Sequence, residues 1–404
     1  MTGTVTIKRL GHQGNGIADG PAGDIYLPHT LPGEVVEILG EGTRIVTPSP
    51  DRVKPPCMHF KSCGGCALQH ASDSFVAGWK IDVVRTALKA QGLSADFKPV
   101  KTSPSKSRRR ATFTGKRTKK GAMVGFHARA SSQLVPVPDC KILHADIVAS
   151  FSMLERLTRI AASRSAEISL AVTLSLNGLD VDVSGAKPAN GPLLAELGAF
   201  CEAEKLARLG WNGEIVATRQ APAQKFGRAT VVPPPGAFLQ ATVQGETDLV
   251  DAIIQAVGPA RRIADLFAGC GTFALSLAHQ AEILAVESDA ASLRALDAGW
   301  RLAPNLKTVE TSVRDLFRRP LLPAELAKFD AVVIDPPRAG AKAQIEELAA
   351  SKVARIASVS CNPVTFARDA AVLVKGGYRL EWVQVIDQFR WSPHIELVAA
   401  FTRS

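Results

Sequence analysis

The stretch 262–287 constrains the fold of this chain more than any other part of its sequence. An apolar run at 262–267 leads into a Gly-x-Gly turn at 269–271, and a segment with helical spacing follows. A second apolar run, at 283–286, ends in the acidic residue Glu287. A strand, a glycine turn, a helix and another strand form one unit of a parallel sheet, with a ligand site where the helix begins. We therefore expect an α/β domain in the C-terminal part of the chain.

Further carboxylates end the expected strands of this domain. Glu287 is placed for ribose hydroxyls, and Asp315 ends a third strand where an adenine would lie. The buried apolar run 329–334 delivers Asp335 to the carboxyl edge of the sheet. The third glycine of the dinucleotide motif is absent, which disfavours a pyrophosphate. Together these features resemble the adenosylmethionine site of a Rossmann-like methyltransferase.

Cys361 is the candidate nucleophile. The run 355–359 reads as a buried strand, and Pro363 stops its ladder, so the thiol lies at a strand end where it can face a cleft. A thiol suits attack on a soft, polarised carbon if a neighbour lowers its pKa enough to supply thiolate near neutral pH. The alternative is a buried structural cysteine.

The length and net charge of the chain limit which functions it can have. A chain of 404 residues predicts two or three domains, and it contains no apolar run long enough to span a membrane and no signal-peptide core at its start. A net charge of +10 and a pI near 9.4 indicate a polyanion partner, most simply nucleic acid, although a generally basic protein stays an alternative. The segment 98–120 is a basic run that predicts either a phosphate-binding sheet face or an ordinary solvated surface.

Four cysteines form a candidate metal centre. Cys57, Cys63 and Cys66 fall within ten residues, and Cys140 is the natural fourth ligand. Four thiolates suit either Zn²⁺ or an iron–sulfur cluster, and spacing does not separate the two. Zinc ribbons usually carry two Cys-x-x-Cys pairs and only one such pair exists here, which favours iron–sulfur. Unliganded cysteines are the remaining alternative.

The first fifty residues predict a small barrel, because short strands alternate with glycine turns. The segments 10–18 and 31–36 resemble a TRAM domain, an OB-like barrel that binds RNA. A β-module that binds nothing stays an alternative. The expected domains are then a barrel at 1–50, a central α+β iron–sulfur and RNA-binding domain at 51–228, and a methyltransferase domain at 229–404.

Three late motifs occur in order: Asp-Pro-Pro-Arg at 335–338, Ser-Cys-Asn-Pro at 360–363 and His-Ile-Glu at 394–396. With them, nearly the whole chain resembles the RNA uracil-5 methyltransferases, apart from Thr272, where relatives often have Asn, and from 389–392. The resemblance implies a [4Fe–4S] cluster on the four cysteines and S-adenosylmethionine bound by six residues. These six are Gln240, Phe267, Thr272, Glu287, Asp315 and Asp335.

The expected chemistry follows from the residues. Uracil C5 is a poor nucleophile, but addition of the Cys361 sulfur at C6 makes an enolate whose C5 accepts the methyl group. Glu396 then removes the C5 proton and the sulfur leaves. By resemblance the substrate is 23S ribosomal RNA, with transfer RNA as an alternative, and a cytoplasmic monomer is expected. The rivals are a cytosine-5 RNA methyltransferase, which would want a cysteine in the loop at Asp335, and a non-catalytic iron–sulfur RNA-binding protein.

Overall fold

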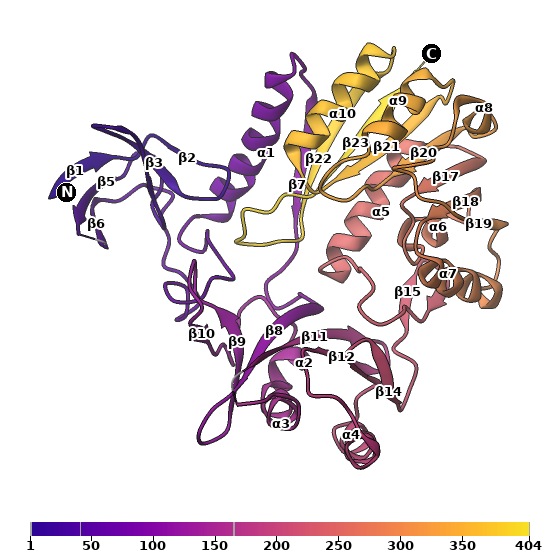
Figure 1. Cartoon of the computed structure of the whole chain (residues 1–404). Helices are drawn as coiled ribbons and strands as arrows, with labels where there is room; N and C mark the ends of the chain where they lie inside the picture. Colours follow the sequence, from indigo (N-terminus) through magenta and orange to yellow (C-terminus); the bar gives the residue numbers. More distant parts are fainter. Residues whose placement is uncertain (1, 41, 165, 404) are drawn as a thin grey trace.

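The computed structural model of the chain describes residues 2–40, 42–164 and 166–403. Three parts follow one another along the sequence: a small N-terminal β-module, a central sheet backed by helices, and a large C-terminal α/β layer (Figure 1). Within these ranges, no helix is both long and apolar enough to cross a bilayer.

The N-terminal module is entirely β-structure. Its six strands form two antiparallel three-stranded sheets, β1-β5-β6 and β2-β3-β4, around a small core that includes Ile7 and Val36. The strands are β1 (Thr2–Thr6), β2 (Arg9–Leu10), β3 (Gly16–Gly20), β4 (Gly23–Leu27), β5 (Val35–Leu39) and β6 (Gly42–Thr47). The predicted short strands with glycine turns are therefore present.

The central part is α+β, as predicted. A seven-stranded sheet runs in the order β10-β9-β8-β11-β12-β13-β14, and α3 and α4 pack on one face of it (Figure 1). Alternating apolar residues of β11 point into this core, which is why one face of the sheet is buried. The strands are β8 (Arg110–Arg117), β9 (Ala122–His127), β10 (Leu134–Val135), β11 (Glu167–Ser175), β12 (Gly178–Ser184), β13 (Arg208–Trp211) and β14 (Glu214–Thr218). The helices are α2 (Ala145–Ala149), α3 (Phe151–Ala161) and α4 (Gly191–Ala203).

The C-terminal part is a doubly wound sheet in the order β19-β18-β17-β20-β21-β23-β22-β7, with β23 antiparallel to both of its neighbours. Helices α5, α6 and α7 cover one face, and α1, α8, α9 and α10 cover the other. Its strands are β17 (Arg262–Leu266), β18 (Glu282–Glu287), β19 (Val309–Val313), β20 (Ala331–Ile334), β21 (Arg355–Ser360), β22 (Arg379–Asp387) and β23 (Leu397–Thr402). Its helices are α5 (Val243–Val257), α6 (Thr272–Leu277), α7 (Ala290–Leu302), α8 (Pro323–Leu326), α9 (Lys342–Ala350) and α10 (Pro363–Lys375). A hairpin of β15 (Gln224–Phe226) and β16 (Ala229–Val231) precedes them.

One early segment joins this late sheet. Strand β7 (Asp96–Thr102) pairs in parallel with β22, and α1 (Asp73–Ala90) packs against α10. Val84 and Leu88 of α1 are buried in the core beneath β21 and β22. Residues 73–102, which the expected division placed in the central domain, therefore extend the C-terminal layer, because the apolar face of α1 is buried there.

Candidate active site

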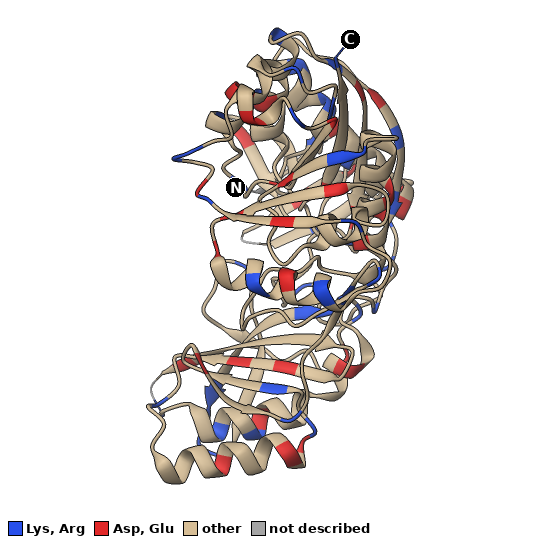
Figure 2. Cartoon of the chain, turned by 90° about the vertical axis from the view of Figure 1, so that its right-hand side faces the viewer, with Lys and Arg blue, Asp and Glu red and all other residues tan. Residues whose placement is uncertain are grey.

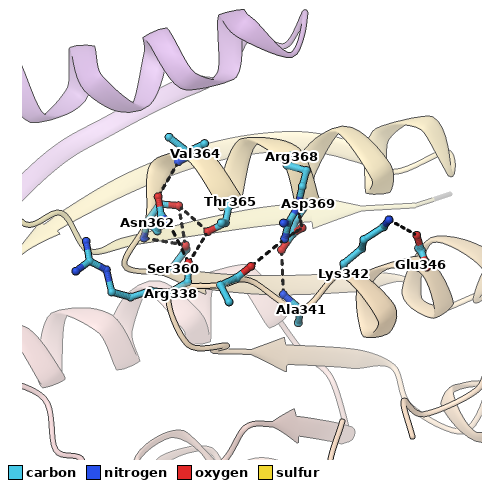
Figure 3. A network of polar contacts seen from close by, with 11 residues as sticks. Arg338, Ala341, Lys342, Glu346, Ser360, Asn362, Val364, Thr365, Arg368 and Asp369 are labelled. Carbon is cyan, nitrogen blue, oxygen red and sulfur yellow. Dashed lines mark hydrogen bonds and ion pairs between the residues drawn. The ribbon is translucent and has the colours of Figure 1, made fainter. Parts of the chain in front are cut away.

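Cys361 lies in the tight connection between β21 and α10. The Ser360 hydroxyl accepts a hydrogen bond of 3.2 Å from the backbone N–H of Asn362. The Asn362 side chain caps α10 by accepting from the N–H of Val364 at 3.1 Å (Figure 3). Pro363 is the first helical residue, so the predicted end of the strand is correct. The thiol is half-exposed at this turn.

The loop after β20 is held against the same turn. Asn362 and Thr365 both donate side-chain hydrogen bonds to the carbonyl of Arg338, at 3.0 and 3.2 Å (Figure 3). Farther along the loop, the N–H of Ala341 donates to the carboxylate of Asp369 at 3.2 Å. These contacts tie the Asp-Pro-Pro-Arg sequence to the turn that carries the thiol, although the two segments are separate in sequence.

Glu396 is buried at the start of β23. Its backbone carbonyl accepts from the N–H of Ile386 at 2.8 Å, which closes the loop between β22 and β23. The side-chain amide of Gln388 donates to the Glu396 carboxylate at 3.3 Å and to the Gln240 side-chain oxygen at 2.6 Å. Gln388 in turn accepts from the N–H of Ala241 at 2.7 Å. The candidate base and a candidate cofactor residue thus share one buried partner.

Gln388 was not among the residues predicted from the sequence. A signal was present, because a polar pair at 387–388 follows directly on the strand 383–386, just before the loop that ends at Glu396. Such polar residues at the carboxyl edge of a buried strand are often functional. The partner in Gln240 is far away in the chain, so only the fold shows what Gln388 holds.

Cys361, Glu396 and Asp335 form one electrostatic group. Burial raises the pKa of Glu396 well above its usual value, and the charge of Asp335 adds to this effect. Burial also raises the pKa of Asp335 to about 7. The pKa of the Cys361 thiol rises to about 11, first through burial and then through the charges of Glu396 and Asp335. Among these neighbours only Arg338 lowers the thiol pKa, so in the free protein the surroundings of Cys361 disfavour the thiolate, whereas a neighbour that lowers the pKa was the condition for a ready thiolate.

The glycine turn begins the candidate cofactor site. Gly269 and Gly271 have φ of 54° and 91°, and a Cβ on Gly271 would lie 2.7 Å from the Leu296 side chain. The Glu287 carboxylate accepts from the N–H of Gly269 at 3.1 Å, which joins the end of β18 to the turn after β17. Thr272 is the first residue of α6. The turn therefore needs both glycines, and it brings Glu287 beside it.

The remaining candidate cofactor residues surround this turn. Phe267 has φ of 64°, and its ring lies 5.4 Å from that of Phe317. The Asp315 carboxylate accepts from the N–H of Phe317 at 2.9 Å. Asp265 is buried below, and its pKa rises to about 8 through burial and the charges of Asp335 and Glu287. A bound cation would relieve this crowding of acids, so the residues present fit a ligand with a sulfonium charge.

A cleft of about 1580 Å³ joins Cys361 to the N-terminal half. It is lined by the β2–β3 region, the cysteine segment, α1, the turn at Cys361 and the residues 392–395. Six of its lining residues are basic: Lys8, Arg9, Arg108, Arg129, Lys141 and Arg338. The candidate nucleophile therefore opens onto a large groove whose charged residues are mostly basic, which suits a polyanion.

The four predicted cysteine ligands line the same cleft. Burial raises the pKa of Cys66 to about 12, and the charges of Cys140, Cys63 and Cys57 add to it. The pKa of Cys63 is likewise raised by burial, and then by Cys140 and Cys57. The fold therefore brings the four thiols near one another, although no group of three or more His, Cys, Asp or Glu among the described residues has the geometry of a metal site.

Part of the basic run turns inward. Buried Arg109 donates to the carbonyl of Gln240 at 3.0 Å and also pairs with Glu246, while Arg110 donates to the carbonyl of Leu239 at 2.9 Å. These arginines therefore bind the segment that contains the candidate cofactor residue Gln240, rather than a phosphate group. The exposed basic residues of the run are Lys101, Lys106, Lys116, Arg117, Lys119 and Lys120. Figure 2 shows acidic and basic residues interspersed on the face drawn there.

Comparisons with known proteins show which family this chain resembles. A family model described as tRNA (Uracil-5-)-methyltransferase matches residues 234–403. A relative from Brucella suis described as an uncharacterized RNA methyltransferase is 44% identical over 100% of this chain and 98% of its own. The 23S rRNA (uracil(1939)-C(5))-methyltransferase RlmD of a Shewanella strain is 32% identical over 98% of this chain and 94% of its own.

One solved structure shares the fold over the whole length. The Pyrococcus abyssi tRNA (uracil-54, C5)-methyltransferase, in complex with S-adenosyl-L-homocysteine, gives a TM-score of 0.76 at 23% identity, covering 100% of this chain and 99% of the other. Fold and site together define an S-adenosylmethionine-dependent RNA methyltransferase. The chain belongs to the RNA uracil-5 methyltransferase family, which confirms the resemblance found in its sequence.

Proposed function

We propose that the protein methylates C5 of one uridine in 23S ribosomal RNA through a transient bond between Cys361 and C6 of the base. The observation that carries this is the placement of Cys361, Glu396 and Asp335 in one electrostatic group beside the cationic cleft. The ribosomal target is supported by the relative named for 23S rRNA, which aligns with 98% of this chain.

The proposed reaction uses three side chains. The thiolate of Cys361, formed by loss of the S–H proton to solvent, bonds to C6, and the C5=C6 electron pair moves toward O4, which makes C5 nucleophilic. Bound S-adenosylmethionine supplies the methyl group that C5 takes. The Glu396 carboxylate then removes the C5 proton, C5=C6 forms again and the sulfur leaves. We propose that Asp335 accepts a hydrogen bond from the uracil edge.

Charge in the pocket explains how the two reacting groups reach their active forms. The acids raise the pKa of Cys361 and of Glu396 in the free protein, and Arg338 opposes this at the thiol. Positive charge brought into the acid-lined pocket lowers both pKa values, which favours the base form of Glu396 and the nucleophilic form of Cys361. The base is taken out of any stack to reach the thiol, so we expect a loop or flipped uridine.

We infer that Cys57, Cys63, Cys66 and Cys140 hold a [4Fe–4S] cluster that links two distant segments next to the cleft. The convergence of the four thiols supports this, as does Gly64, where a Cβ would lie 2.8 Å from the carbonyl oxygen of His127. Protein purified without oxygen should be brown, absorb at about 400 nm and hold about four irons per chain. Stoichiometric zinc instead would overturn this assignment.

We infer that the N-terminal module at 1–50 is a TRAM-like OB barrel and acts with the central sheet in RNA binding, where the central domain is 51–228 without residues 73–102 and the methyltransferase domain is 229–404 with them added. Its contribution of Lys8 and Arg9 to the cleft supports this role. An enzyme that modifies ribosomal RNA works where that RNA is made, so we expect it in the cytoplasm, as a monomer.

Transfer RNA is the second candidate substrate, because the matching family model carries that description. The deciding experiment incubates the protein with S-adenosylmethionine and RNA from a strain that lacks its gene. We expect one 5-methyluridine in 23S RNA by mass spectrometric mapping. The mark in transfer RNA alone would select the alternative, 5-methylcytidine would support the cytosine-5 rival, and unmodified RNA would contradict the proposal.

A further inference from the structure

Residues 387–396, which comprise the last residue of β22 and the loop that leads from it to β23, set the position of Glu396. We call these residues the base loop. Its two ends are tied by the hydrogen bond from Ile386 to the Glu396 carbonyl, at 2.8 Å. Between these ends the chain has no helix or strand, and Trp391 near its tip has φ of 60°. The loop lacks regular hydrogen bonding, so other groups must hold its shape.

Lys80 of α1 provides such contacts. It is fully buried, and its ammonium donates to the Asp387 carboxylate at 2.6 Å. It also donates to the carbonyl of His394 at 2.8 Å and to that of Phe389 at 3.4 Å. An ammonium has three N–H donors, and here all three acceptors belong to the base loop. They lie on both of its limbs, so one side chain joins the limb that leaves β22 to the limb that ends at Glu396.

Other contacts hold both the limbs and the tip of this loop. The N–H of Ser103 donates to the Asp387 carbonyl at 3.0 Å, and the Gln388 amide donates to the Glu396 carboxylate at 3.3 Å. The N–H groups of Ala67 and Leu68 donate to the Trp391 carbonyl at 2.9 and 3.0 Å. Arg390 donates to the Ser103 carbonyl at 3.3 Å. The Gln388–Glu396 hydrogen bond and the packing of the Phe389 and His394 rings, with centroids 5.6 Å apart, also join the two limbs. Lys80 differs from them because it donates to main-chain carbonyls of both limbs, and so it helps to fix the position of the backbone next to Glu396.

We propose that Lys80 is a positioning residue for the proton-removal step: it holds the base loop so that the Glu396 carboxylate lies at C5 of the bound uracil. This rests on the proposed role of Glu396 as the base. The competing explanation is that Lys80 only attaches α1 to the sheet. The two differ in what they predict for the separate steps, because Cys361 lies on the turn between β21 and α10, outside the base loop.

The double variant Lys80→Met with Asp387→Leu separates them. Removing both charges avoids an unpaired buried ion, and buried ion pairs replaced by apolar residues of similar size often keep their stability. The carbonyls of His394 and Phe389 nevertheless lose their donor. Lys89→Met, at an exposed position of the same helix, is the matched control.

Tritium release from RNA labelled at uridine C5 reports proton removal, and a denaturing gel reports the covalent adduct. For the double variant we expect release to slow by about 10- to 100-fold. The RNA adduct should accumulate, with unchanged S-adenosylmethionine affinity and an unchanged urea midpoint. The Lys89→Met control should behave like the unmodified protein in all four measurements.

Wild-type release, or an equal loss of adduct formation and release, would overturn the proposal. Should the double variant not fold, Lys80→Arg decides: it keeps the charge, but its planar fork does not match three acceptors around one nitrogen. It should show the same accumulation of adduct, and wild-type kinetics would again refute the inference. The unmodified protein is measured in parallel. If it releases no tritium itself, the result counts against the proposed function and not against the role of Lys80.

Discussion

The side-chain amide of Gln388 donates a 2.6 Å hydrogen bond to the side-chain oxygen of Gln240, across 148 positions of sequence. The same amide lies 3.3 Å from the carboxylate of Glu396. A residue expected to bind the cofactor and the residue expected to remove the proton are therefore connected through one buried group. Because buried polar groups need partners, replacing Gln388 should affect both Gln240 and Glu396.

Replacement of Gln388 by Leu should weaken S-adenosylmethionine binding. The variant leaves Gln240 and the N–H of Ala241 without a partner, and a buried polar group left unpaired costs about 1–3 kcal/mol. We expect the Kd to rise about tenfold in calorimetric titration. Gln384→Leu, on the strand just before Gln388, loses only a hydrogen bond to the carbonyl of Pro99 and should bind normally. Equal affinities for the two variants would show that this connection does not matter for the cofactor.

Replacement of Glu396 by Gln should trap the protein on its RNA. Without the base, the C5 proton stays, the C5=C6 bond is not restored and the Cys361 sulfur does not leave. A denaturing gel should show a covalent complex that needs S-adenosylmethionine. Cys361→Ala should give neither complex nor tritium release, whereas Cys201→Ala, in the central core, should keep both. Free turnover in the Glu396 variant would rule this residue out as the base.

The rate of Cys361 alkylation should rise with pH over a higher pH range than that of an ordinary thiol. Its pKa is about 11, above the ordinary value of 9.0, so less thiolate exists at each pH than for a free thiol. In the free protein the rate with iodoacetamide should still rise between pH 9 and 10, with no plateau. Glu396→Gln removes a negative charge and should lower the pKa, which speeds alkylation at pH 8, whereas Arg338→Gln should slow it.

Peptide mass spectrometry is the appropriate measurement, because the chain has seven cysteines. A plateau below pH 9, or the opposite order of the two variants, would mean that the acids do not act on this thiol as the structure indicates.

Gly340→Ala should destabilise the loop that carries Arg338. Gly340 has φ of 75°, and a Cβ there would lie 2.4 Å from the guanidinium of Arg368 and 2.6 Å from the carboxylate of Asp369. A non-glycine residue in a strained conformation costs about 1–3 kcal/mol, which urea unfolding would measure. Gly198→Ala is the matched control, since it lies in α4 with nothing within 4 Å and should stabilise by about 0.5–1 kcal/mol. Similar effects at both positions would contradict the packing described here.

Much of the C-terminal fold follows from local sequence. Apolar runs predict the strands, Gly-x-Gly predicts the turn before α6, and Pro363 predicts the start of α10. Parallel strands bring their carboxyl ends to one edge, so residues such as Glu287 and Asp335 were expected there together. These features depend on neighbours along the chain, and for that reason a single sequence reveals them.

Other features depend on contacts between distant segments. Lys80 and Asp387 are 307 positions apart, and nothing local to either shows that they pair in the interior. Nothing local shows that β7 joins the C-terminal sheet. Nothing local shows that Arg109 is buried either, because its charge alone predicts a position on the surface.

By itself, the sequence determined the order of strands and helices and the reactive groups at their ends, because backbone geometry and side-chain chemistry are properties of short segments. Only the tertiary structure decided which buried charges pair, which acidic residues lie close enough to raise one another's pKa values, and how far the thiol pKa rises. Burial and Coulomb energies depend on distances through space, and those distances exist only once the chain has packed.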